Sequence, residues 1–319
     1  MISSGGYVGR LAPSPTGALH LGNARTFMIA YLRARSLGGK LIMRMEDLDH
    51  PRDKPGAATA AVEDLRWLGF EWDEEYVQSK RKRFYAEALK RLHDAALAYP
   101  CICSRRDVEA AQSAPHEGEQ LFYPGLCRGR FSDWDSACRE LARRGESRIP
   151  CWRFRTAAGE AVEFEDVFAG KYRQDVALTL GDFPLARDEF GAGYTLAVVV
   201  DDAAMGVTEV IRGDDLLAAT PAQILLQRAL GLPKVRYCHV PLVVGPDGKR
   251  LAKRHGDTRI SALRERGVSA ESVVGMLAAT CGWCGRGEEI SLESLLPRFT
   301  LDTVPRRKVW YNSDRYEDF

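Results

Sequence analysis

The chain has 319 residues, a length that allows about two domains and a large buried core. Hydrophobic residues make up 45% and charged residues 28%, and the absence of an apolar run of about 20 residues excludes a helical membrane span. The formal net charge is +1, so a nucleic-acid partner would need a local basic patch. The start, Met1 to Gly6, is too short for a signal peptide, and we therefore expect a cytoplasmic protein with no membrane partner.

The first hundred residues alternate between strand and helix patterns. They predict strands at 7–12 and 40–45 and helices at 23–37, 57–68 and 80–97, with Gly38-Gly39 ending the first helix. This alternation predicts a parallel sheet. The basic run Lys80 to Arg83 is more typical of a solvated helix face than of a binding site.

The pattern changes between about residues 100 and 192. Short segments with clustered cysteines are followed by predicted strands at 152–155 and 161–165. Strand and helix signals of the first kind return at 194–200, 207–211, 218–230 and 236–240, and mainly helical segments, including 270–279, follow residue 256. We therefore predict an α/β domain split between residues 1–100 and 193–257, an insertion at 101–192 and a helical segment at 258–319.

A string of fourteen residues, Arg10 to Asn23, carries the first candidate site. It leads from a predicted strand through a loop into a helix, where free backbone N–H groups and the helix dipole favour a phosphate. Gly17 and Gly22 permit close approach of the backbone, and His20 can donate to developing phosphate charge. Taken alone, His20 to Asn23 would more often be a helix cap.

A second string, Asp247 to Gly256, has glycines flanking four cationic residues. A lysine in such a loop can neutralise triphosphate charge in a transition state. Alone, this segment would more often be the tip of a hairpin with solvated lysines.

Together the two strings resemble the HIGH and KMSKS signatures of the class I aminoacyl-tRNA synthetases in their glutamyl-type form. His20 to Asn23 takes the first position and Arg250 to Arg254 the second, although Arg250 replaces a lysine and Ala252 replaces a serine. The resemblance implies a Rossmann-type catalytic domain that uses ATP with Mg²⁺, with His20 and Lys253 as catalytic residues. The ATP-binding residues that it implies are Pro13, Thr16, Gly17, His20, Gly22, Asn23, Arg250, Leu251 and Lys253.

The charges of glutamate identify candidate residues for the amino-acid substrate. Its two carboxylates call for two cations and its ammonium for one anion; Arg10 and Arg212 suit the carboxylates, and Glu46 suits the ammonium. The family resemblance implies the same positions and adds three neutral residues, so the predicted glutamate site is Arg10, Ala12, Ser14, Glu46, Tyr194 and Arg212. The alternative is that Glu46 and Arg212 merely join surface ion pairs.

Clustered cysteines in the insertion predict a structural zinc site. Cys101, Cys103 and Cys127 supply three thiolates, and tetrahedral zinc needs one further ligand. His116 is the chemically commoner candidate for it. Tyr123 is implied by the resemblance of this region to the glutamyl-queuosine tRNA(Asp) synthetases. Cys281 and Cys284 form a CxxC pair outside any βαβ unit, and we assign them no function.

About 60 residues follow Lys253, too few for the anticodon-reading region of a glutamyl-tRNA synthetase. This resembles the glutamyl-queuosine tRNA(Asp) synthetases, which implies glutamate transfer to queuosine in the anticodon stem-loop of tRNA(Asp). Candidate RNA contacts are Arg105-Arg106, Arg264 with Arg266, and Arg306-Arg307-Lys308. Two alternatives remain: a truncated glutamyl-tRNA synthetase that charges the 3′ end of tRNA(Glu), and a catalytically silent RNA-binding relative.

Overall fold

A computed structural model describes residues 6–48, 54–110, 122–249, 251 and 258–311. Its first layer is a parallel sheet of strands β1 (Val8–Leu11), β2 (Lys40–Met45) and β3 (Glu74–Val77), in the order β1-β2-β3. A second parallel pair consists of β9 (Glu209–Gly213) and β10 (Arg236–Val240). A hydrogen bond from the Thr208 amide to the Val8 carbonyl, 2.9 Å long, places β9 beside β1. The predicted parallel sheet is therefore confirmed.

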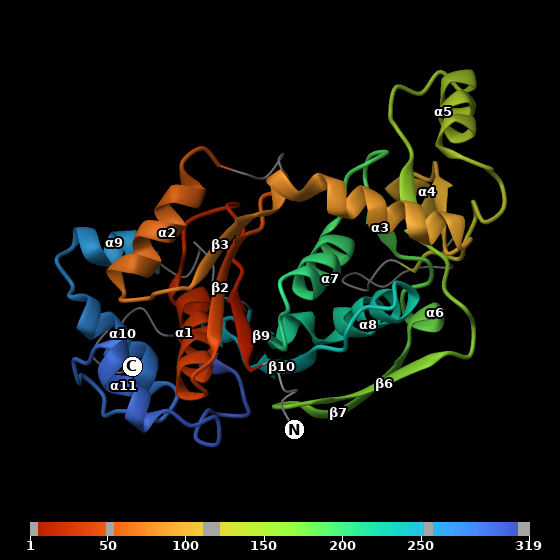
Figure 1. Ribbon diagram of the computed structural model, residues 1–319. Helices are drawn as coiled ribbons and strands as arrows, with labels where there is room; N and C mark the ends of the chain where they lie inside the picture. The colour runs from red at the N-terminus through yellow and green to blue at the C-terminus, as the bar shows by residue number, and fades with distance from the viewer. Residues whose placement is uncertain (1–5, 49–53, 111–121, 250, 252–257, 312–319) are drawn as a thin grey trace.

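Parallel neighbours need crossover connections, and helices supply them here. Helix α1 (Leu21–Ser36) connects β1 to β2, α2 (Ala57–Trp67) connects β2 to β3, and α8 (Thr220–Ala229) leads from β9 to β10 after the short 3₁₀ helix η3 (Asp214–Ala219). Figure 1 shows α1 packed against the β1–β3 sheet. The buried strands carry apolar side chains on both faces, which is the pattern of a covered parallel sheet.

The predicted helix 80–97 is shorter than expected. It consists of the 3₁₀ turn η2 (Gln78–Arg81) and helix α3 (Lys82–Asp94). Ala96 adopts a φ of 56°, and the Leu97 amide bonds back to the Leu92 carbonyl at 2.8 Å, which closes the helix before residue 97. The basic run is not wholly solvated either, because Arg81 bonds to the carboxylate of buried Asp201 at 2.7 Å.

Antiparallel strands form the next part of the chain. Strands β4 (Ala98–Cys101), β5 (Cys151–Phe154) and β8 (Pro184–Ala186) make one sheet, and β6 (Ala161–Asp166) with β7 (Gly170–Asp175) makes a hairpin. Helices α4 (Arg105–Ala110), α5 (Trp134–Arg143) and α6 (Val176–Thr179) belong to the same stretch. The predicted boundary after residue 100 falls within β4.

The antiparallel part shares its core with the helices that follow and precede it. Trp152, Phe154 and Leu185 belong to one buried apolar cluster with Leu89 of α3 and Leu196 of α7 (Tyr194–Ala204). Helix α3 crosses from the parallel sheet to this region (Figure 1). The β6–β7 hairpin reaches β10, so residues of this region can contribute to the centre of the molecule.

The C-terminal part packs against α1. It contains helices α9 (Ile260–Glu265), α10 (Ala270–Ala279) and α11 (Leu292–Leu295), the 3₁₀ turn η5 (Leu296–Arg298), and strand β12 (Val309–Trp310), which pairs with β11 (Val243–Val244). The predicted helix 270–279 is confirmed. Cys281 is buried, and the thiol of Cys284 lies 3.3 Å from the Gly275 carbonyl oxygen. None of the helices in the described ranges has the length and apolar character of a bilayer span.

Candidate active site and metal centre

The loop between β1 and α1 holds the first predicted string. His20 is the N-cap of α1, and its Nδ1 accepts a hydrogen bond from the Asn23 amide at 3.4 Å. Gly22 lies against this imidazole, because a Cβ built there would come within 3.2 Å of two ring atoms. Gly17 faces open space. The histidine ring is thus held at the helix N-terminus, where the helix dipole favours an anion.

The second string approaches the first through its flanking residues. The Leu21 amide donates to the Thr258 carbonyl, and the Ile260 amide donates to the Leu19 carbonyl, both at 3.0 Å. Leu251 is buried, and its amide donates to the Val243 carbonyl at 3.2 Å. Arg250 and Lys253 lie outside the described residues. The residues that follow the string, Thr258 and Ile260, therefore lie at the N-terminus of α1.

A buried charge network lies at the end of β1 and β2. Arg44, whose side chain is fully buried, donates to Glu46 at 3.0 Å and to Asp202 at 2.6 Å. Arg10 donates to the Ile211 carbonyl at 3.0 Å, and its Nε lies 3.9 Å from Asp202. Within the described residues this buried Nε has no hydrogen-bond acceptor. Arg10 is thus connected to Glu46 by a series of ion pairs, first to Asp202, then to Arg44 and then to Glu46.

Burial sets the protonation preferences in this network. Burial lowers the pKa of Arg10, and the positive charges of Arg44 and Arg212 act in the same direction, against Asp202. Burial also raises the pKa of Glu46, although Arg44 and Arg10 oppose the shift. Both groups therefore gain from an incoming partner of opposite charge.

Arg212, on β9, presents its guanidinium to neutral acceptors. Its Nε donates to His239 at 3.0 Å, and its Nη2 donates to Thr220 at 2.7 Å and to Gln223 at 2.8 Å. Its Nη1 lies 3.4 Å from the hydroxyl of Tyr194, the first residue of α7. The predicted pair Tyr194 and Arg212 is therefore brought together, and the Nη1 edge is the part of the guanidinium with hydrogen-bonding capacity to spare.

The three arginines of this region face three carboxylates when Asp166, behind His239, is counted, so the formal charges of the network balance. Ala12 and Ser14 follow β1 in the same loop, with Ser14 exposed, and the amide of Glu46 donates to the Pro13 carbonyl at 2.9 Å. This hydrogen bond ties the strand that carries Glu46 to the first string. The arrangement can bind a small molecule that carries carboxylates and an ammonium beside a phosphate site.

Four residues of this network have no counterpart in the sequence prediction: Arg44, Asp166, Asp202 and His239. One signal was available for Arg44, since an arginine in the middle of the apolar strand 40–45 requires a buried partner. Asp202 likewise follows an apolar helical run. For Asp166 and His239 the partners come from distant strands, and sequence spacing carries no such signal.

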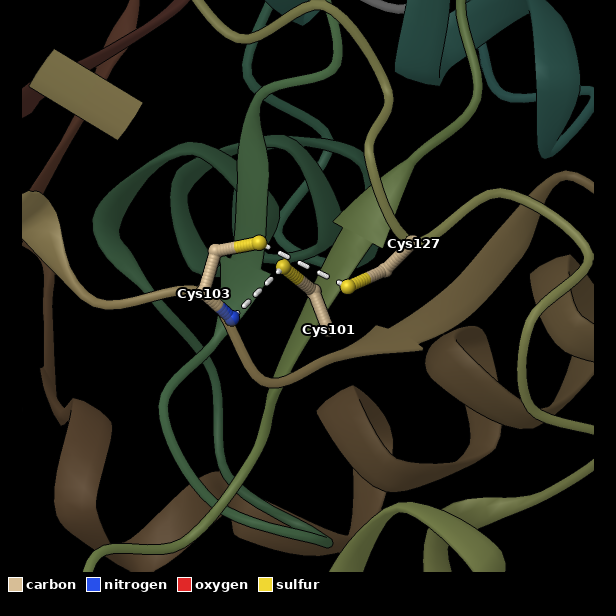
Figure 2. A group of neighbouring side chains, drawn as sticks. All are labelled: Cys101, Cys103 and Cys127. Atoms are coloured by element: carbon tan, nitrogen blue, oxygen red, sulfur yellow. Dashed lines mark hydrogen bonds between the residues drawn. The ribbon is translucent and has the colours of Figure 1, made fainter. Parts of the chain in front are cut away.

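The predicted cysteine cluster is assembled by β4 and the loop before α5. The thiols of Cys101, Cys103 and Cys127 lie within 4.8 Å of one another, and those of Cys103 and Cys127 are 3.5 Å apart. Figure 2 shows the three sulfurs converging on one point. Hydrogen bonds from Cys103 and Cys127 lower the pKa of Cys101, which favours a thiolate.

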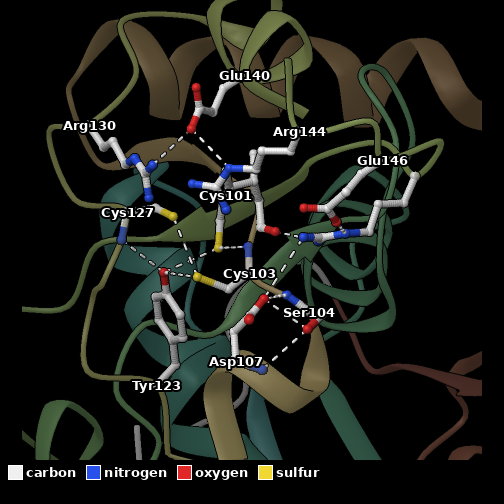
Figure 3. Close-up of polar contacts among 12 residues, drawn as sticks. Cys101, Cys103, Ser104, Asp107, Tyr123, Cys127, Arg130, Glu140, Arg144 and Glu146 are labelled. Carbon is white, nitrogen blue, oxygen red and sulfur yellow. Dashed lines mark hydrogen bonds and ion pairs between the residues drawn. The ribbon is translucent and has the colours of Figure 1, made fainter. Parts of the chain in front are cut away.

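Tyr123 completes this cluster. Its hydroxyl lies 3.2 Å from the Cys101 sulfur and 3.5 Å from that of Cys103 (Figure 3). Two sulfurs bound to one tetrahedral zinc lie about 3.8 Å apart, so the donor set fits this ion. The guanidinium of Arg153 covers the Tyr123 ring at 3.8 Å and donates to the Cys101 sulfur at 3.3 Å. His116 lies outside the described residues.

The candidate RNA-binding arginines have varied surroundings. Arg105 is exposed and pairs with Glu109 at 2.8 Å, whereas Arg264 lies 3.7 Å from buried Asp64. Arg306 donates to the Phe168 carbonyl at 2.6 Å. Arg307 and Lys308, which follow Arg306, are exposed.

Comparisons with known proteins identify the family of this chain. The family model for the catalytic domain of class I tRNA synthetases (E and Q) matches residues 8–307. A glutamyl-Q tRNA(Asp) synthetase from Symbiobacterium thermophilum is 46% identical over 94% of each chain, and one from Rhodopirellula baltica is 45% identical over 99% of this chain and 94% of that one. A glutamate--tRNA ligase from Hydrogenobaculum sp. is 37% identical over 96% of this chain and 65% of that protein.

A solved structure shows the same fold. The crystal structure of a glutamate tRNA ligase from Elizabethkingia meningosepticum in complex with its amino acid superposes with a TM-score of 0.80 at 27% identity. The match covers 97% of this chain and 68% of that one.

Proposed function

This chain belongs to the class I tRNA synthetases (E and Q), and we propose that it activates L-glutamate with ATP and transfers the glutamyl group to queuosine in the anticodon loop of tRNA(Asp). The observation that carries the proposal is the similarity to glutamyl-Q tRNA(Asp) synthetases over nearly the whole of both chains. ATP and tRNA are cytoplasmic substrates, and we place the reaction in the cytoplasm.

The amino-acid site selects glutamate by charge. One carboxylate pairs with Arg212 at its Nη1 edge and with the Tyr194 hydroxyl, the other with Arg10, and the ammonium with Glu46. Ala12 and Ser14 line the same loop. Glutamine offers a neutral amide in place of one carboxylate, so one of the two guanidinium groups would meet no anion from the substrate.

The activation step takes place at the N-terminus of α1. An oxygen of the glutamate α-carboxylate attacks the α-phosphorus of ATP, the bond to the bridging oxygen breaks, and pyrophosphate leaves. His20 and Lys253 stabilise the charge that develops on the phosphates. Pro13, Thr16, Gly17, Gly22, Asn23, Arg250 and Leu251 shape the nucleotide site. Mg²⁺ bound with ATP supplies neutralisation of phosphate charge.

The second step transfers the glutamyl group. A hydroxyl of the queuosine cyclopentene ring attacks the carbonyl carbon of the adenylate, and AMP leaves with the bonding electrons. Unpaired anticodon bases can be splayed out and read individually, so a stem-loop is an adequate acceptor. Cys101, Cys103, Tyr123 and Cys127 would hold Zn²⁺, which would stabilise the fold near β4.

Glutamate-dependent exchange of pyrophosphate into ATP tests the activation step. We expect exchange with glutamate, and weaker exchange with glutamine and aspartate, in the absence of tRNA. Lys253→Ala should lower the rate by roughly 30- to 1000-fold, because a charged contact made in the transition state is lost. No exchange with any amino acid, beside an active control synthetase, would support the silent RNA-binding alternative instead.

A further inference from the structure

The buried histidine of β10, His239, connects Asp166 to Arg212 of the candidate amino-acid site. His239 Nδ1 lies 2.6 Å from an oxygen of Asp166, and His239 Nε2 lies 3.0 Å from the Nε of Arg212. All three side chains are buried. We propose that Asp166 and His239 are positioning residues for the amino-acid site: they fix the guanidinium of Arg212 with its Nη1 edge directed to the substrate carboxylate.

Hydrogen bonding determines the tautomer of His239. The Nε of Arg212 is always a donor, so Nε2 of His239 must accept, and the ring proton must lie on Nδ1 and point to Asp166. An imidazolium could not accept from Arg212. Burial lowers the pKa of His239, and the charges of Arg212 and Arg10 add to this effect against the hydrogen bond to Asp166. The neutral ring required by the geometry is therefore also the favoured form.

Asp166 is itself fixed by the backbone. Its carboxylate accepts from the amides of Phe168 at 2.9 Å, Ala169 at 2.7 Å and His239 at 3.1 Å. Although burial acts to raise the pKa of Asp166, these bonds and the bond from the His239 ring outweigh it, and the pKa lies below its ordinary value. The carboxylate of Asp166, accepting from the ring, keeps the imidazole proton on Nδ1.

Sheet register brings the imidazole to the guanidinium. His239 on β10 is the direct partner of Arg212 on β9, so both side chains lie on the same face of the paired strands. Asp166, the last residue of β6, is delivered by the β6–β7 hairpin, and the Val167 amide bonds to the Tyr237 carbonyl at 2.8 Å. A slip of one residue would move Arg212 or His239 to the other face.

The neutral ring of His239, and not a carboxylate, contacts Arg212, so the positive charge of the guanidinium is not paired there. Within the described ranges, no carboxylate forms an ion pair with Arg212, and its direct partners are a neutral ring, a hydroxyl and an amide. A carboxylate in direct contact would occupy the guanidinium and compete with the substrate. Placing Asp166 behind His239 balances the charge at a distance and leaves the Nη1 group for the amino acid.

This inference rests on the proposed function, and a matched pair of variants tests it separately. In His239→Gln the amide oxygen can replace Nε2 as the acceptor for Arg212, whereas in His239→Asn the shorter amide can replace the donor to Asp166 but leaves Arg212 Nε unpaired. We expect the KM for glutamate in pyrophosphate exchange to rise roughly 10- to 100-fold in His239→Asn and less than about threefold in His239→Gln. The KM for ATP should change less than about twofold in both.

Asp166→Asn should behave like His239→Asn, because its amide group no longer holds the proton on Nδ1. His93→Asn on α3, whose ring contacts the Ala98 carbonyl, is the control for loss of a histidine away from the site. An unchanged KM for glutamate in His239→Asn would overturn the positioning role. A fall in kcat together with equal rises in the KM for glutamate and for ATP in both His239 variants would overturn it as well. Wild-type exchange with glutamate, measured beside them, shows whether the proposed function itself holds.

Labelled imidazole nitrogens provide a direct test of the His239 tautomer in the wild-type protein. In ¹⁵N-histidine protein at pH 7.5 we expect the signal of His239, assigned by its loss in His239→Gln, to show a protonated Nδ1 and an unprotonated Nε2. An Nε2–H tautomer or an imidazolium at that pH would contradict the chain from Asp166 to Arg212.

Discussion

Replacing Arg44 with Met removes the cation that holds the two carboxylates of the candidate amino-acid site. Arg44 has no exposed side-chain surface and bonds to Glu46 at 3.0 Å and to Asp202 at 2.6 Å, both of which are less than a tenth exposed. Methionine is similar in length but carries no charge. The variant therefore leaves Glu46 and Asp202 buried with Arg10 as their remaining neighbouring cation.

Loss of one partner from a buried ion pair destabilises a protein by about 3 to 5 kcal/mol, because the other charge stays buried without compensation. At about 2 to 4 °C for each kcal/mol, Arg44→Met should lower the melting temperature by about 6 to 20 °C. Glu46 should also bind its proton more tightly, since burial raises its pKa and Arg44 opposes that shift. The KM for glutamate should then rise as the pH falls, because protonated Glu46 cannot pair with the ammonium.

Calorimetry and pyrophosphate exchange at pH 6, 7 and 8 measure both effects. Lys90→Met is the control, because Lys90 and Asp94 form an exposed pair on α3 that is worth less than about 1 kcal/mol. If Arg44→Met melts within about 2 °C of the wild type, or no lower than Lys90→Met, Arg44 does not compensate the buried charges of Glu46 and Asp202.

Three further predictions concern other parts of the molecule. Elemental analysis should find about one zinc for each chain, lost in Cys101→Ser and in Tyr123→Phe; retention in Tyr123→Phe together with loss in His116→Ala would assign the fourth ligand to His116. Burial raises the pKa of Asp64 to about 6, above its ordinary value, so its contribution to stability is present below about pH 4 and is lost as the pH rises through 6. Asp64→Asn should therefore raise the melting temperature at pH 8 and change it little at pH 4, and the reverse order would refute the assignment. Gly181→Ala should destabilise the protein more than Gly159→Ala does: both glycines have positive φ, but a Cβ at 181 would lie 2.0 Å from the Tyr123 carbonyl oxygen, whereas one at 159 has nothing within 4 Å. Equal melting temperatures of the two variants would show that the Tyr123 backbone can shift without loss of stability.

Local patterns were sufficient to predict the parallel sheet. The apolar run at 40–45 matches β2, and the amphipathic run at 270–279 matches α10, because both signals depend on the nearest neighbours in the chain. The early end of α3 was not predictable in this way. Ala96 takes a backbone conformation that usually signals glycine, so the sequence carries no stop at that position.

Part of the site was likewise accessible from the sequence. The charges of glutamate and the family resemblance selected Arg10, Glu46, Tyr194 and Arg212, and the structure brings Tyr194 to Arg212 at 3.4 Å and connects Arg10 to Glu46 through Asp202 and Arg44. Their roles in binding stay predictions. The supporting residues were missed because their contacts follow from strand register and tertiary packing: Asp166 and His239 are 73 residues apart in the chain.

Transfer of labelled glutamate, followed by nuclease mapping of the tRNA, tests the central claim most directly. The protein, ATP and labelled glutamate are incubated with tRNA(Asp) that carries queuosine, with the same tRNA carrying unmodified guanine, and with tRNA(Glu). We predict label in the anticodon fragment of the queuosine-containing tRNA(Asp) and none on the other two. Label on the 3′-terminal adenosine of tRNA(Glu) would contradict this account and identify a glutamyl-tRNA synthetase.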